Sequence, residues 1–132
     1  MSKLDETKQK LDTISPTFCL AKWQQVTIHL QNGHTHSCHH PQTHKIPIDE
    51  LEYNPSALHN TSYKKLIRKQ MLDGERPKEC NYCWSVEDTE GSHHSDRIKK
   101  SSNSTWAMPY FDQVSKSKWQ DNIQPAQVEV SF

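Results

Sequence analysis

Four cysteines are the residues of this 132-residue chain whose type and spacing could do chemistry: Cys19, Cys38, Cys80 and Cys83. Cys80 and Cys83 form a C-x-x-C knuckle, in which the two-residue gap lets both sulfurs point into one tetrahedral site. Cys19 and Cys38 lie at strand ends of a predicted β-hairpin over residues 24–38, and such ends lie side by side, so the two thiols can converge. Four thiolates from two separated segments suit Zn²⁺ or an iron–sulfur cluster equally.

The composition favours a bound metal as a source of stability. Leu, Ile, Val and Phe make up 23 of the 132 residues, fewer than chains that build their own core usually contain. Small domains with weak cores commonly depend on disulfides or a metal. The first residues, MSKLDETKQKLD, are polar and are not a secretory signal. We therefore expect a cytoplasmic, reducing setting, in which metal ligation ranks above disulfide formation.

Charge and hydropathy disfavour two classes of partner. The chain has 16 Lys and Arg and 16 Asp and Glu, so its formal net charge is zero. A protein that binds nucleic acid through phosphates usually carries a basic excess, so we do not expect nucleic acid as a partner. No stretch approaches the run of about 18 apolar residues that predicts a membrane-spanning helix, so we expect no membrane partner.

The sequence predicts two elements that would position the cysteines. In residues 24–31 apolar side chains alternate, which predicts a half-buried strand; Asn32-Gly33 is typical of a two-residue hairpin turn, and residues 34–38 form the partner strand. A helix is predicted over residues 61–73, with Gly74 just past its end. Its apolar stripe consists of Tyr63, Leu66, Ile67 and Met71. Its solvated face would consist of Lys64, Lys65, Arg68 and Lys69.

The cysteine spacing resembles a known module. Cys19 is followed by thirteen residues and Gly33, then by four residues and Cys38, and after a long gap by the knuckle. This pattern resembles the twitch module, the shortened SPASM module, of radical S-adenosylmethionine (SAM) enzymes, which has the form C-x(9–15)-G-x(4)-C followed by C-x(2)-C. Trp23, Arg68 and the stretch 74–83 are similar to further positions of that module.

The resemblance implies an α+β fold, a small β-hairpin plus helix that binds metal, over residues 18–88. It implies an auxiliary [4Fe-4S] cluster on Cys19, Cys38, Cys80 and Cys83, which would relay electrons or hold structure. The catalytic C-x(3)-C-x(2)-C motif of the family is missing from this chain. The chain alone is therefore not expected to be catalytic, and SAM and a second [4Fe-4S] cluster would bind only in a full-length protein.

Three further segments lie outside the predicted metal-binding module. Residues 1–17 are predicted to be a disordered tail and residues 89–125 a linker with a short helix near Ile98. Residues 126–132 alternate again and resemble the first strand of a radical SAM barrel, so we expect them to be unpaired or poorly packed in this chain. The chain would then be the N-terminal part of a larger enzyme. Its partners would be the rest of that barrel and a peptide, protein or small-molecule substrate that the sequence does not identify.

Two alternatives use some of the same residues. The first is a structural zinc-binding module for protein contacts on the same four cysteines. The second is an HNH-type nuclease, with roles for His39-His40, Asn54 or Asn60, and His93; its second C-x-x-C pair is missing. Several histidines crowd around Cys38, and His34 and His36 share a strand face that could hold a metal. We expect these histidines mainly at the surface or around the site rather than as ligands.

Overall fold

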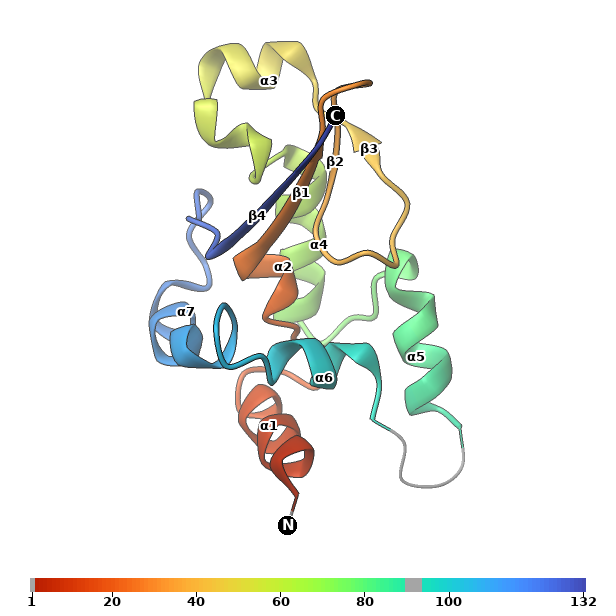
Figure 1. Ribbon diagram of the computed structural model, residues 1–132. Coiled ribbons are helices and arrows are strands. Elements are labelled where there is room, and N and C mark those ends of the chain that lie inside the picture. The colour runs from red at the N-terminus through yellow and green to blue at the C-terminus, as the bar shows by residue number, and fades with distance from the viewer. Residues whose placement is uncertain (1, 90–93) are drawn as a thin grey trace.

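The computed structural model describes residues 2–89 and 94–132. It is a mixed α+β fold, as the sequence predicted, in which helices surround a small sheet (Figure 1). Within the described residues the strands are β1 Gln25–His29, β2 His34–His36, β3 His44–Lys45 and β4 Gln127–Ser131. The α-helices are α1 Lys3–Asp12, α2 Ala21–Gln24, α3 Ile48–Tyr53, α4 Ser62–Leu72, α5 Asn81–Glu87, α6 Asp96–Ser101 and α7 Phe111–Ser117. Short 3-10 helices are η1 Pro55–Leu58, η2 Lys78–Cys80 and η3 Met108–Tyr110.

The predicted hairpin is confirmed, but its turn is longer than expected. β1 and β2 are antiparallel, and the last facing pair is His29 with His34, so four residues form the loop. Gly33 adopts a left-handed φ of 72°, and its N–H donates to the His29 carbonyl at 2.9 Å. Asn32 does not share the positive φ that a two-residue type I′ turn requires at both positions, which is why the turn prediction was wrong.

The strand order is β3-β2-β1-β4, and β4 runs parallel to β1 with Val128 beside Val26. Residues 126–132 were expected to be unpaired or poorly packed: the first was therefore wrong, and the second agrees with the exposure of their apolar side chains. Their backbone is bonded to the sheet, although Val128 and Val130 remain 55% and 47% exposed. The pairing supplies the backbone partners that an isolated strand would lack.

The predicted helix is confirmed as α4, although it turns a different face inward. The Thr61 hydroxyl caps its N-terminus by accepting from the Lys64 N–H at 3.1 Å. Gly74 follows its C-terminus with a φ of 81°. The buried positions are Lys64, Ile67, Arg68 and Met71, whereas Tyr63 and Leu66 are exposed. Lys64 and Arg68 can face inward because they find internal hydrogen-bond acceptors.

The predicted disordered tail is instead part of the fold. Ser2 and Asp5 form a capping box at the start of α1. Leu11, on the same helix, is completely buried in the main core. The sequence prediction rested on polar composition, but Leu4 and Ile14 also pack against the core that buries Leu11. Figure 1 places α1 and the N-terminus at the end of the molecule opposite the sheet and the C-terminus.

Residues 89–125, predicted as a linker, also contribute to this core in their described part. The short helix expected near Ile98 is present as α6, and Ile98 is 1% exposed. Phe111 and Val114 of α7 belong to the same core cluster. The segment is therefore packed against the predicted module over 18–88. None of the described helices is long and apolar enough to cross a membrane.

Candidate metal centre

All four cysteines come together in the fold. Each is a free thiol and is at most 7% exposed. They line one small cavity of about 20 Å³, whose remaining wall includes Met71 and Trp84. Residues distant in the chain thus meet at one place, as the sequence analysis predicted for these positions.

The knuckle is positioned by the start of α5. Cys80 precedes the helix as its N-cap residue and Cys83 lies within its first turn, so the two side chains share one face. The indole N–H of Trp84 donates to the Pro77 carbonyl at 2.8 Å. The Cys80 N–H donates to the same carbonyl at 3.1 Å. Pro77 therefore fixes both the knuckle and the tryptophan beside it.

Cys38 has an unusual backbone. Its φ is 72°, the left-handed region that residues with a Cβ rarely adopt. The conformation is held by a buried hydrogen bond of 2.6 Å from the Cys38 N–H to the side-chain oxygen of Gln25. Strained backbone of this kind clusters at functional sites because the surrounding structure must maintain it. This backbone conformation lies just after β2, where the chain brings Cys38 to the cavity.

The Cys19 segment is held by α6. Arg97 donates to the Phe18 carbonyl at 2.7 Å, and the Ser101 hydroxyl accepts from the Leu20 N–H at 3.0 Å. These two bonds bracket Cys19 on either side. Sequence reasoning missed Arg97 and Ser101, because nothing in a short segment predicted as linker indicates contact with a residue so far away in the chain.

Two buried cations flank the thiols. Lys22 lines the cavity, donates to the Ser37 carbonyl at 3.1 Å and pairs with Glu79. Arg97 also lines the cavity and pairs with Glu87 at 2.9 Å. Sequence reasoning missed both cations as part of the site. Each cation is already paired with a glutamate, and its closeness to the thiols would favour their thiolate form.

Burial makes the thiols of Cys19, Cys80 and Cys83 resist ionisation. Burial raises the pKa of Cys80 to about 12 and that of Cys83 to about 11, and the nearby Cys19 adds to both shifts. Burial, followed by the neighbouring Cys38, also raises the pKa of Cys19. A bound metal or cluster reverses this, because its positive charge stabilises thiolates. The donor set therefore suits a cationic metal group and does not suit a reactive free thiol.

Across residues 2–89 and 94–132, no three His, Cys, Asp or Glu side chains are arranged to hold one metal ion. A tetrahedral zinc site with Zn–S distances of about 2.3 Å would bring each pair of sulfurs to about 3.8 Å. The four cysteines line one cavity of about 20 Å³, the space of about one water molecule, so a zinc ion or a cluster would each have to shift their side chains on binding.

The histidines around Cys38 have other partners. His34 bonds to Thr43 at 2.8 Å, whereas His36 faces His29 across the strands with their Nε2 atoms 3.2 Å apart. His34 and His36 thus bond to different partners, and the structure does not bring them together around a shared metal. His40 is the histidine that lines the cysteine cavity.

The nuclease residues are also dispersed among different partners. His39 bonds to Glu129 at 3.0 Å, and His40 bonds to Asp96. Asn54 bonds to Asn122, and Asn60 accepts from Arg68. His93 lies outside the described residues.

No family model matches the chain, and neither the curated proteins nor the solved structures include a significant match. The interpretation of the site therefore depends on the residues of this chain and their geometry.

Proposed function

We propose that Cys19, Cys38, Cys80 and Cys83 ligate a [4Fe-4S] cluster. The observation that supports it is that all four are buried and line one cavity, although two distant segments supply them. The resemblance to the twitch module points to the same four residues. On this proposal the chain is an auxiliary cluster-binding region of a radical SAM enzyme.

The surroundings of the cysteines fit such a group. Met71 and Trp84 supply an apolar wall, while Lys22 and Arg97 supply positive charge close to the thiolates. Hydrogen bonds, charge and burial are the means by which a protein adjusts the potential of an iron–sulfur cluster. A bound cluster with four cysteine ligands transfers single electrons or holds structure, and it leaves no iron open to a substrate.

Structural zinc on the same cysteines is the second candidate. It needs only the four thiolates, and the buried cations would suit it equally. The cluster is favoured over zinc by the resemblance of the cysteine spacing to the twitch module, which carries a cluster. We therefore rank the cluster above zinc and both above the nuclease, whose residues have separate partners.

The radical chemistry itself would need residues that this sequence lacks. A barrel with the C-x(3)-C-x(2)-C motif would bind SAM and a second [4Fe-4S] cluster. We propose such a barrel as the partner of this region, acting on a peptide, a protein or a small molecule.

Anaerobic reconstitution tests the ligand assignment. The wild-type chain should take up iron and sulfide in equal amounts and show the broad visible absorption of an iron–sulfur cluster. Each of Cys19→Ser, Cys38→Ser, Cys80→Ser and Cys83→Ser should sharply lower both contents. His39→Ala is the matched control, because His39 is near Cys38 in sequence but bonds to Glu129, and it should retain the cluster.

Metal analysis separates the two candidates. Stoichiometric zinc with no iron after reconstitution would show that the site is a zinc module and that the cluster proposal is wrong. If Cys19→Ser stays fully loaded while His39→Ala empties the site, the ligand assignment is wrong.

A further inference from the structure

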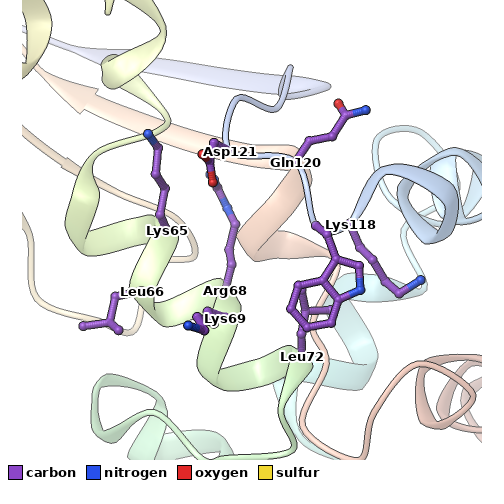
Figure 2. A pocket seen from close by; sticks show the side chains of 9 residues that line it. Lys65, Leu66, Arg68, Lys69, Leu72, Lys118, Gln120 and Asp121 are labelled. Carbon is purple, nitrogen blue, oxygen red and sulfur yellow. The ribbon is translucent and has the colours of Figure 1, made fainter.

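A groove of about 250 Å³ separates α4 from residues 118–121 and shares no lining residue with the cysteine cavity. Figure 2 shows side chains of α4 along one wall and those of the later segment along the other. Its lining consists of Lys65, Leu66, Arg68, Lys69, Leu72, Lys118, Trp119, Gln120 and Asp121. The groove combines positive charge with apolar and aromatic surface.

The positive charge is concentrated here although the whole chain is neutral. Lys65, Lys69 and Lys118 lie in the lining, against a single acid, Asp121. Lys118 donates to the Ser115 carbonyl at 2.6 Å, a neutral partner that leaves its charge unbalanced. Within the described residues, none of the three lysines forms an ion pair, although Lys65 lies close enough to Glu50 to help lower the pKa of that carboxyl.

Arg68 adds a buried charge to the same groove. It is 3% exposed, and its guanidinium donates to the carbonyls of Lys22 and His59 and to the Asn60 side chain. All three acceptors are neutral. Burial alone lowers the pKa of Arg68 to about 10, and no carboxylate acts against this shift. Arg68 is therefore a buried cation that lacks a counter-ion among the described residues, in the same lining as Lys69 and Lys118, which form no ion pair there.

Trp119 supplies a flat apolar surface in the groove. It is 61% exposed, whereas Trp23 and Trp84 are buried. Leu66, another residue of the lining, is 53% exposed. An exposed indole close to several cations is the combination that binds a planar base next to a phosphate.

We propose that this groove binds a nucleoside phosphate, with its base against Trp119 and its phosphates near Lys65 and Lys69. The unbalanced positive charge selects an anion, and lysine ammonium groups serve as point charges for phosphate. The volume is close to that of small-molecule sites, which begin at about 300 Å³. A nucleoside phosphate therefore fits better than an acidic peptide. A peptide would need a longer groove and would make no use of the Trp119 ring. The proposal does not depend on the cluster.

Calorimetry with ATP tests the site on the whole chain. The wild type should bind ATP, and adenosine or inorganic phosphate alone should bind more weakly, because each offers only half of the recognised chemistry. Lys69→Glu should weaken ATP binding by about tenfold, the equivalent of one charge-assisted contact. Lys3→Glu makes the same charge change on an exposed residue of α1 and should leave the affinity unchanged.

The tryptophan provides a second readout. ATP should quench the fluorescence of the wild type, and Trp119→Phe should lose this quenching while retaining most of the affinity, because it keeps a stacking ring. Circular dichroism should show that the variants remain folded. The proposal is overturned if ATP does not bind, if Lys69→Glu binds ATP as the wild type does, or if an oligoglutamate peptide binds in preference to ATP.

Discussion

The backbone N–H of Leu30 donates a hydrogen bond of 2.8 Å to the carbonyl of Ser131. This contact closes one end of the parallel pair between β1 and β4, two strands from nearly opposite ends of the chain. At the other end of the pair, the Ala126 N–H donates to the Gln24 carbonyl, also at 2.8 Å. The last described strand is therefore bonded to the sheet at both of its ends.

Deleting residues 127–132 should free the Leu30 amide. Its hydrogen exchange should rise toward the rate of an unbonded amide, because its acceptor is lost. The Gly33 amide bonds to His29 inside the hairpin and serves as the control, with unchanged exchange. Two-dimensional NMR of the two chains measures both sites. Equal protection of Leu30 with and without the strand would contradict the β1–β4 pairing.

Leu11 anchors α1, so truncating it should destabilise the whole domain. Leu11→Ala removes a completely buried side chain and should lower the free energy of unfolding by about 2–5 kcal/mol. Gln9→Ala on the exposed side of the same helix should change it by less than about 0.5 kcal/mol. Urea denaturation measures both. Equal, small changes in the free energy of unfolding would mean that α1 is not anchored and that the segment is the disordered tail that the sequence predicted.

The elements that the sequence predicted well are those whose signals are local. The hairpin follows from alternation around Gly33, and α4 follows from the Thr61 cap and Gly74. The four cysteines could be selected because their spacing and type are rare. In each case the deciding interactions connect residues close together in the chain, or residues whose chemistry admits few alternatives.

The remaining features depend on contacts that no local pattern encodes. The burial of Lys64 and Arg68 depends on acceptors from β2 and from the residues before α4, so charge alone placed them wrongly at the surface. Arg97 acts on the site through the Phe18 carbonyl. The pairing of β4 likewise requires knowing that β1 has a free edge, which is a property of the assembled sheet.

Cys38 offers a test of backbone strain at the site. Glycine has no Cβ and adopts the observed φ of 72° freely, so Cys38→Gly should be more stable than Cys38→Ala by up to about 1 kcal/mol. At Cys80, where φ is −101°, the order should be reversed. Thermal denaturation of the four apo variants gives both comparisons. All four should fail to hold the cluster, and the same order at both positions would show that Cys38 is not strained.

Lys64 should make stability depend on pH. Its side chain is 5% exposed and its Nζ donates to the Thr35 hydroxyl at 2.8 Å. Burial, followed by the charges of Arg68 and Lys22, lowers the pKa of Lys64 to about 6, from 10.5 for an ordinary lysine. Between these two values the unfolded chain binds a proton that the folded chain does not hold.

The free energy of unfolding should therefore rise with pH across this window, with a contribution from Lys64 of up to about 1.4 kcal/mol per pH unit. Urea denaturation at several pH values between about 6 and about 9 measures the slope for the wild type and for Lys64→Met. The variant carries no titrating group at this position, so its slope should be lower by the Lys64 contribution, while every other titrating group contributes alike to both proteins. Parallel pH profiles would mean that Lys64 keeps its proton in the folded state, with its charge balanced by Glu79.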